Sequence, residues 1–142
     1  MKKILLVPLD ERPCNYEYQA HLAEGTDLDI ILPPKDILAY KKEPGDPDAV
    51  FRWMEENAEG CAGAVISIDT LVYSSILASR LHHDGLETLK ARLLRLRAFK
   101  KAHPEMPLFA FTLIMRNPRY SSSDEEPDYY EDWGREIHRY GF

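Results

Sequence analysis

Several side chains that could take part in chemistry follow the first apolar run of the chain. The run Ile4–Val7 leads into a segment that holds an acid, a guanidinium, a thiol and an amide, in the order Asp10, Arg12, Cys14 and Asn15. In an open α/β sheet, ligands bind just beyond the carboxyl ends of the strands. We therefore expect the segment 8–15 to form part of a functional site.

Polar residues also follow two later apolar runs. Asp69 and Tyr73 come after the run Ala62–Ile68, and Arg116 comes after the run Leu108–Ile114. If the first and third runs are neighbouring strands, about 4.8 Å apart, Asp10 faces Asp69 across one crevice. The two arginines that follow the first and fourth runs would then reach the same space.

A carboxylate pair with arginines nearby can support several kinds of chemistry. Asp10 and Asp69 could act as general acid and base, or as the pair that hydrolyses a glycoside. With oxygens from Ser67 or Asn15 they could hold Mg²⁺, although the pattern requires no cofactor. The arginines suit a phosphate or a carboxylate. The structural alternative is that both acids cap helices or fix turns, with Arg12 paired to Asp10.

Other reactive side chains give weaker signals. Cys14 lies near a predicted helix start, where thiol pKa values fall, but a small packed thiol is the better interpretation. The five histidines show no spacing typical of a metal site. The acids between Asp124 and Asp132 are typical of a solvated surface. The chain has no dinucleotide fingerprint, phosphate-binding P-loop or G-x-S-x-G elbow.

The elements that must position these residues alternate between strand and helix. Apolar runs predict strands at 3–7, 28–32, 62–68 and 108–114, and helical patterns follow each of them. Asn15 is a candidate N-cap for the first helix, and Asp46-Pro47 opens the next. Leucines at 86, 89, 93 and 96 predict the buried seam of a third helix.

This alternation predicts a three-layer α/β fold. A doubly wound, mostly parallel sheet of about four strands in the order 2-1-3-4, Rossmann-like or flavodoxin-like, is favoured for one domain spanning 1–142. The alternative is half of a (β/α)8 barrel, which as a complete fold needs about 250 residues.

Composition limits the partners that the chain can have. The 142 residues carry a net charge of −6, so nucleic acid and anionic membranes are poor partners and a small molecule is favoured. No run approaches the roughly 18 apolar residues of a membrane span. Two cysteines, Cys14 and Cys61, suggest reduced thiols and a cytoplasmic protein.

The motifs resemble those of the bacterial domain of unknown function 4127 family. The resemblance begins with Pro8-Leu9-Asp10-x-Arg12-Pro13-x-Asn15 and runs in order through the rest of the chain. The later matching motifs are Pro33-Pro34, Pro44-Gly45-Asp46, Ser67-x-Asp69-x-Leu71-x-Tyr73, Ser79-Arg80 and Met115-Arg116. One departure is Ser74-Ser75, where the family tends to have two glycines.

The resemblance indicates which residues are important, but it does not indicate their chemical roles. Members of the family are much longer than this chain, so the resemblance implies that the chain corresponds to their N-terminal part. It also implies that the chain could contact a C-terminal domain or other subunits of an oligomer. The polar residues that match its motifs are Asp10, Arg12, Asn15, Asp69, Tyr73, Arg80 and Arg116. Cys14 and the histidines do not match.

Three functional hypotheses remain open from the sequence. The first is a hydrolase of a polar, hydroxyl-rich molecule such as a sugar derivative, with Asp10 and Asp69 catalytic and the five other motif residues binding substrate. The second is a non-catalytic domain that binds an anionic small ligand through Arg12, Arg80 and Arg116. The third is an N-terminal fragment whose polar loops serve an interface.

Overall fold

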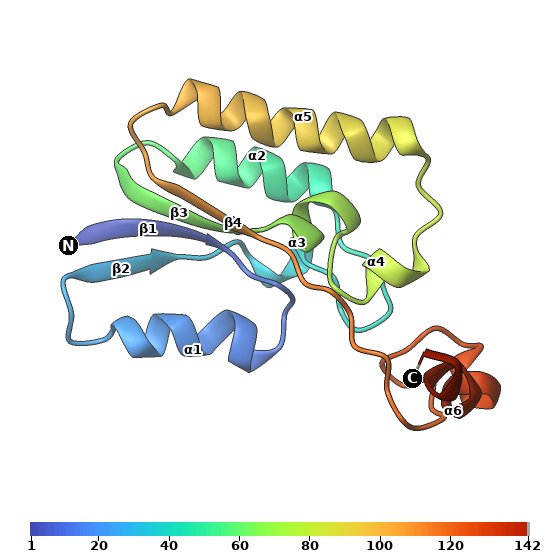
Figure 1. Cartoon of the computed structure of the whole chain (residues 1–142). Coiled ribbons are helices and arrows are strands. Elements are labelled where there is room, and N and C mark those ends of the chain that lie inside the picture. The colour runs from blue at the N-terminus through green and yellow to red at the C-terminus, as the bar shows by residue number, and fades with distance from the viewer. Residues whose placement is uncertain (142) are drawn as a thin grey trace.

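Four parallel strands form the centre of the molecule. The computed structural model describes residues 1–141 (Figure 1). The sheet has the order β2-β1-β3-β4, which confirms the predicted doubly wound arrangement. In a (β/α)8 barrel, neighbouring strands follow chain order instead. The strands are β1 (Lys2–Val7), β2 (Leu28–Ile31), β3 (Cys61–Ser67) and β4 (Leu108–Phe111).

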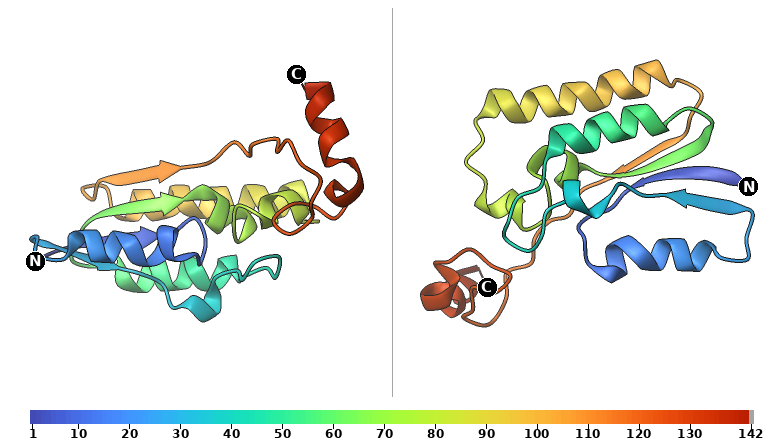
Figure 2. Two further views of the ribbon diagram at one scale, coloured as in Figure 1. Left: turned by 90° about the horizontal axis from the view of Figure 1, so that it is seen from below. Right: turned by 180° about the vertical axis from the view of Figure 1, so that it is seen from behind.

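Helices cover both faces of this sheet. α1 lies on one face, and α2 and α5 lie on the other (Figures 1 and 2). Two short helices, α3 and α4, follow β3, while α6 stands away from the sheet beyond its carboxyl end (Figure 2). The helices are α1 (Pro13–Ala23), the 3-10 helix η1 (Lys35–Ile37), α2 (Pro47–Asn57), α3 (Ile68–Tyr73), α4 (Ala78–Leu81), α5 (Leu86–Ala102) and α6 (Tyr130–Gly141).

The main core lies between the sheet and the α2–α5 layer. Leu5, Val7 and Ile66 point from the strands into this layer and are fully buried. Phe51 and Phe99 meet them from α2 and α5. Burying side chains of this size stabilises a fold by about 1.5–3 kcal/mol each. This core holds the strands whose ends form the candidate site.

The predicted leucine seam of α5 is wrong in part. Leu86 is 76% exposed and Leu93 is 46% exposed. The buried face instead runs through Leu96 to Phe99, which lies three residues further along the same helix face. A helix of this length carries leucines on more than one face, and packing against the rest of the fold, including α3, selects the inner one.

Two helix starts test the predicted caps. Asp46 caps α2 as expected, because its Oδ1 accepts from the amide of Ala49 at 3.0 Å. Asn15 does not cap α1, because the helix already begins at Pro13 with Arg12 in the N-cap position. The amide of Asn15 is engaged elsewhere, by the Asp10 carboxylate.

β4 ends at Phe111 rather than at the predicted Ile114. Its partner β3 ends at Ser67, which pairs with Phe111, and the chain turns into α3 at the next residue. The backbone after Phe111 therefore has no neighbouring strand and follows an irregular path along the sheet edge. Asp69 binds this path at Thr112 and Leu113.

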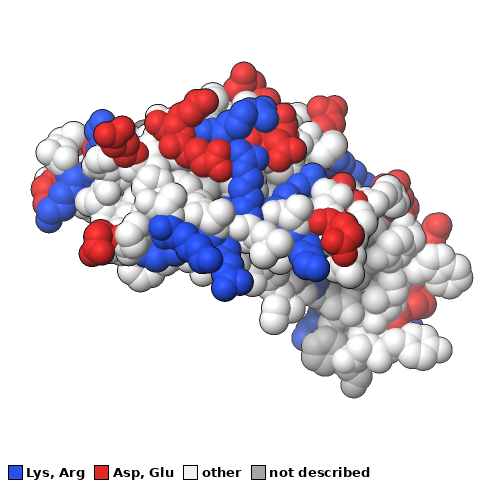
Figure 3. Space-filling model, turned by 90° about the horizontal axis from the view of Figure 1, so that it is seen from above, with Lys and Arg blue, Asp and Glu red and all other residues white. Residues whose placement is uncertain are grey.

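The α2–α5 surface carries charges of both signs side by side (Figure 3). Arg95 on α5 binds Glu55 on α2 through two contacts of 2.9 and 2.7 Å, and it reaches Asp48 at 3.2 Å. Its side chain therefore links the two helices of this layer. No helix within residues 1–141 has the length and apolar character required to cross a membrane.

A buried hydroxyl joins the carboxyl ends of β1 and β3. Oγ1 of Thr70 lies 2.6 Å from the carbonyl oxygen of Pro8 and 2.9 Å from that of Leu9. It also lies 3.2 Å from Oγ of Ser67, which caps α3. Thr70 and Ser67 are completely buried, so this contact fixes the loop after β1 against the start of α3.

We predict that Thr70→Val lowers the free energy of unfolding by about 1–3 kcal/mol, because the buried carbonyls of Pro8 and Leu9 lose their donor while the side-chain volume is kept. Urea denaturation would measure the loss. Thr88→Val, at an exposed position of α5, is the control and should change stability by less than about 0.5 kcal/mol. Equal effects of the two substitutions would contradict the assignment.

Candidate functional site

A cavity of about 900 Å³ opens beyond the carboxyl ends of the strands. This volume lies within the range of small-molecule sites, roughly 300–1,000 Å³. Its walls come from the loop after β1, the turn at residues 39–41, the segment 75–77 after α3, the segment 113–116 after β4, and residues 124–126. Of the sequence-predicted site residues, Asp10, Arg12 and Arg116 line it.

The Asp10 carboxylate organises the loop after β1. Its Oδ1 accepts from the backbone amide of Arg12 at 3.1 Å and from the side-chain amide of Asn15 at 2.8 Å. Its Oδ2 accepts from Nε and Nη2 of Arg12 at 3.0 and 2.7 Å. The side chain is only 5% exposed, so these four donors compensate a buried charge.

This pairing fixes the guanidinium of Arg12. The hydrogen bond to Asp10 raises the pKa of Arg12 above its ordinary value, against an opposing contribution from burial. Its third nitrogen, Nη1, lies 3.8 Å from Oε1 of Glu125, beyond hydrogen-bonding distance. Within residues 1–141, Nη1 has no hydrogen-bond acceptor.

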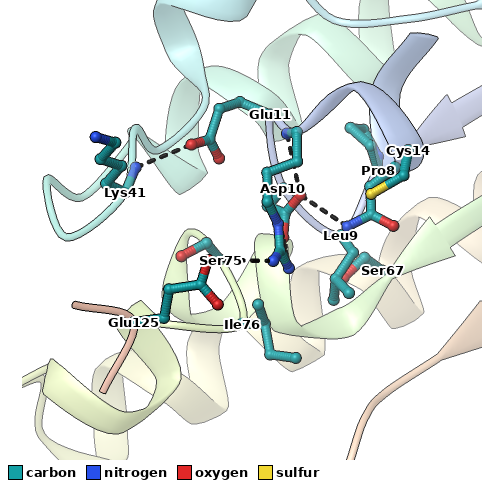
Figure 4. A network of polar contacts seen from close by, with 12 residues as sticks. Pro8, Leu9, Asp10, Glu11, Cys14, Lys41, Ser67, Ser75, Ile76 and Glu125 are labelled. Carbon is teal, nitrogen blue, oxygen red and sulfur yellow. Dashed lines mark hydrogen bonds and ion pairs between the residues drawn. The ribbon is translucent and has the colours of Figure 1, made fainter. Parts of the chain in front are cut away.

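Figure 4 shows the surroundings of this loop. The Glu11 carboxylate points toward Lys41 and accepts a hydrogen bond of 2.9 Å from its backbone amide. Glu125 lies beside Ser75, with Ile76 close by (Figure 4). Glu11 and Glu125 thus both line the cavity with Arg12, and Glu125 is the acid that faces its guanidinium.

Asp69 contacts the chain that leaves β4. It is 3% exposed, and its oxygens accept from Oγ1 of Thr112 at 3.2 Å and from the amide of Leu113 at 3.1 Å. Among the described residues it is not part of the cavity wall that includes Asp10. In this arrangement Asp69 holds the chain that leaves β4 and positions the wall that ends at Arg116.

Arg116 presents an uncompensated charge to the cavity. Its Nη2 donates to the Tyr120 hydroxyl at 2.9 Å, and its guanidinium carbon lies 5.9 Å from the centre of that ring. No carboxylate of residues 1–141 lies within 4.0 Å of it. It is therefore a cation without an ionic partner on the cavity wall.

Three of the predicted binding residues lie outside the cavity wall. Asn15 donates to Asp10 and so supports the loop. The ring of Tyr73 packs against His82, with centroids 4.7 Å apart. Arg80 forms a largely buried ion pair with Glu126 and lies 4.8 Å above the Tyr130 ring. Its charge is thus already neutralised within the chain.

Sequence reasoning missed two features of the wall. Glu126, expected on a solvated surface, is 2% exposed, and 46 residues separate it from its partner Arg80. Tyr40 and Lys41 line the cavity on a tight turn that Gly45 supports. A Cβ on Gly45 would lie 2.5 Å from the amide nitrogen of Ala39, so only glycine fits there. Gly45 lies in the Pro44-Gly45-Asp46 motif, which was the sequence signal for this turn.

The side-chain contacts give little support to the magnesium site that these residues could form. Both oxygens of Asp10 already accept hydrogen bonds, and Oγ of Ser67 accepts from the amide of Thr70. Within residues 1–141, no three His, Cys, Asp or Glu side chains gather in an arrangement suited to a metal ion.

A second hollow, of about 640 Å³, lies at the opposite end of the sheet, around the start of β3. Three acids line it, Glu55, Glu59 and Glu105, and Glu55 is bound to Arg95. Burial raises the pKa of its thiol, Cys61, whose Sγ lies 3.2 Å from the carbonyl oxygen of Asn57. These contacts disfavour a reactive thiolate, so the cavity at the strand carboxyl ends is the better candidate.

Comparison with known proteins gives one match. The family model described as "Protein of unknown function (DUF4127)" matches residues 4–142. The chain belongs to this family. The searches of curated proteins and of solved structures found no match. The motif Asp10-x-Arg12-x-x-Asn15 of this DUF4127 chain corresponds in three dimensions to one hydrogen-bonded unit.

The two serines at 74 and 75, where the family tends to have glycines, differ in backbone conformation and in hydrogen bonding. Ser74 has φ of 80°, in the left-handed region that glycine adopts without steric cost, and it ends α3. Its buried hydroxyl has no hydrogen-bond partner. Ser75 differs, because its Oγ accepts from the amide of Ala78 at 3.1 Å and so stabilises the turn into α4.

We predict that Ser74→Gly raises the free energy of unfolding by about 1 kcal/mol, because it removes the left-handed strain of a Cβ residue and an unsatisfied hydroxyl. Ser75→Gly is the matched control and should lower the same quantity by about 1 kcal/mol through loss of its cap. Urea denaturation of both variants tests the assignment, and a destabilised Ser74→Gly protein would refute it.

We predict that Asp10→Asn lowers the free energy of unfolding by about 2 kcal/mol, because an amide cannot accept from all four donors and Arg12 loses its counter-charge. Asp36→Asn, at an exposed position of η1, serves as the control for loss of one negative charge. If thermal and urea denaturation of the two variants agree within about 0.5 kcal/mol, the carboxylate does not organise the loop.

Proposed function

We propose that this chain binds a small molecule through an anionic group, phosphoryl or carboxylate, held between Arg12 and Arg116. One observation carries the proposal. Asp10 fixes two nitrogens of the Arg12 guanidinium, and the third is left without an acceptor beside the cavity. A guanidinium held in one orientation loses little side-chain entropy on binding an anion.

Arg116, on the segment after β4, supplies the second cation of the cavity wall. Its hydrogen bond to the Tyr120 hydroxyl restrains the side chain, and within residues 1–141 its remaining nitrogens have no carboxylate to bind. Arginine suits this role because its planar donors match the oxygens of phosphate and carboxylate groups. In this proposal Asp10 and Asn15 are positioning residues, since they act on the ligand through Arg12.

The remaining lining favours a compact ligand with both polar and apolar surface. Ile76, Leu77 and Leu113 form an apolar wall, and Tyr40 adds an aromatic ring at the rim. Ser75 and Glu11 also line the cavity, where they could form hydrogen bonds with hydroxyl groups of a ligand. A sugar phosphate or a sugar acid combines these properties.

We predict that Arg116→Gln weakens binding of inorganic phosphate or malonate about tenfold, because a charge-assisted contact worth about 1.5 kcal/mol or more is lost. Isothermal titration calorimetry at constant ionic strength would measure both probes. Arg119→Gln removes the same charge from an exposed position outside the cavity wall and should bind as the unmodified chain does. Equal loss in both variants would indicate only long-range attraction.

A paired-carboxylate hydrolase is the second candidate. The observation in its favour is that Asp10 lines the cavity, next to the proposed anion position. The four donors on Asp10 count against a role in proton transfer, because both carboxylate oxygens already accept hydrogen bonds from within the loop. Assays with a panel of nitrophenyl glycosides separate the two candidates. Turnover that disappears in folded Asp10→Asn and Asp69→Asn proteins would favour hydrolysis.

A further inference from the structure

Residues 124–128, here named the acidic strap, attach to three separate parts of the molecule. Glu125 faces Arg12 of the loop after β1, and Glu126 pairs with Arg80 of α4. Asp128 binds Lys42 of the turn after η1 at 2.7 Å. Because Asp124, Glu125 and Glu126 also line the cavity, the strap forms one of its walls.

The three attachments differ greatly in strength. The Glu126 side chain is 3% exposed and that of Arg80 is 14% exposed, so separating this pair would leave buried charges. The Glu125 and Asp128 side chains are 65% and 93% exposed, and such pairs contribute at most about 1 kcal/mol. The strap is therefore anchored firmly at Glu126 and only weakly on either side of it.

The C-terminal helix keeps the strap close to the cavity. Gly134 of α6 packs directly on the backbone of Tyr120, where an added Cβ would lie 2.4 Å from the carbonyl oxygen. Ser123 binds Glu131 of the same helix through its amide and its hydroxyl, at 2.9 and 3.0 Å. Residues 124 and 125 thus lie between two fixed points, the contact of Ser123 with α6 and the Arg80–Glu126 pair, and this part of the strap is the part that can move.

The charges of the wall explain why such movement would matter. With the strap in place, four basic and five acidic side chains line the cavity. Asp124 and Glu125 supply two of those acids. If they move outward, the remaining wall carries four basic and three acidic side chains, and two of the three acids, Asp10 and Glu126, already have an arginine partner. The cavity then attracts anions.

We propose that Glu125 is an internal competitor for the ligand. Its carboxylate occupies the side of Arg12 that an anion would use, and binding of the anion displaces it. This inference rests on the proposed function and adds a means of regulating it. The 3.8 Å separation fits a competitor that is held by charge alone, because no hydrogen bond has to be broken for it to leave.

The test compares phosphate binding by Glu125→Gln and by the unmodified chain, using calorimetry at constant ionic strength. Removing the competitor should tighten phosphate binding about threefold to fivefold, the ratio that corresponds to an exposed ion pair. Glu136→Gln, at an exposed site on α6, makes the same change in net charge and should leave the affinity unchanged. Hydrogen exchange should also show faster exchange of the 124–125 amides when phosphate is bound.

The outcomes separate this inference from the proposed function. Equal affinity of Glu125→Gln and the unmodified chain, with Arg116→Gln still weakened, would overturn the competitor role and leave the anion site intact. Tightening by Glu136→Gln as strong as that by Glu125→Gln would also overturn it, because net charge alone would then explain the effect. Absence of phosphate binding in every variant would overturn both.

Discussion

The buried carboxylate of Asp10 is the interaction on which the loop after β1 depends. A charge at this depth is tolerated only because four N–H donors surround it, and three of those donors belong to one arginine. The same contacts decide where the chain enters α1 and where Arg12 points. The shape of the loop, the start of α1 and the position of the Arg12 cation therefore all depend on the same contacts.

Further contacts connect this loop to the ends of the neighbouring strands. The Thr70 hydroxyl holds the carbonyls before Asp10, while Asp69 holds the chain that leaves β4. Both residues lie in α3, which begins directly after β3. One short helix thus connects three strand ends, and the cavity walls from β1 and from β4 are both positioned by it.

The strands and their order could be predicted because those signals are local. Apolar runs of four to seven residues mark buried parallel strands, and a chain of this length leaves few topologies for them. Asp46-Pro47 is a local signal of the same kind. The partners of Arg80 and Asp69 could not be predicted, because each pairing joins positions more than 40 residues apart and depends on tertiary packing. The inner face of α5 was misassigned for the same reason.

The outer edge of the sheet has a consequence for the behaviour of the protein in solution. Within residues 1–141, β4 has a neighbouring strand on one side only, and its Phe109 is 68% exposed. No charged residue occurs between Leu108 and Met115. Edge strands usually carry lysines or prolines that prevent pairing with another chain. Here the net charge of −6 has to supply that protection at a distance. Salt that screens this repulsion removes the barrier to edge-to-edge aggregation, so colloidal stability depends on ionic strength.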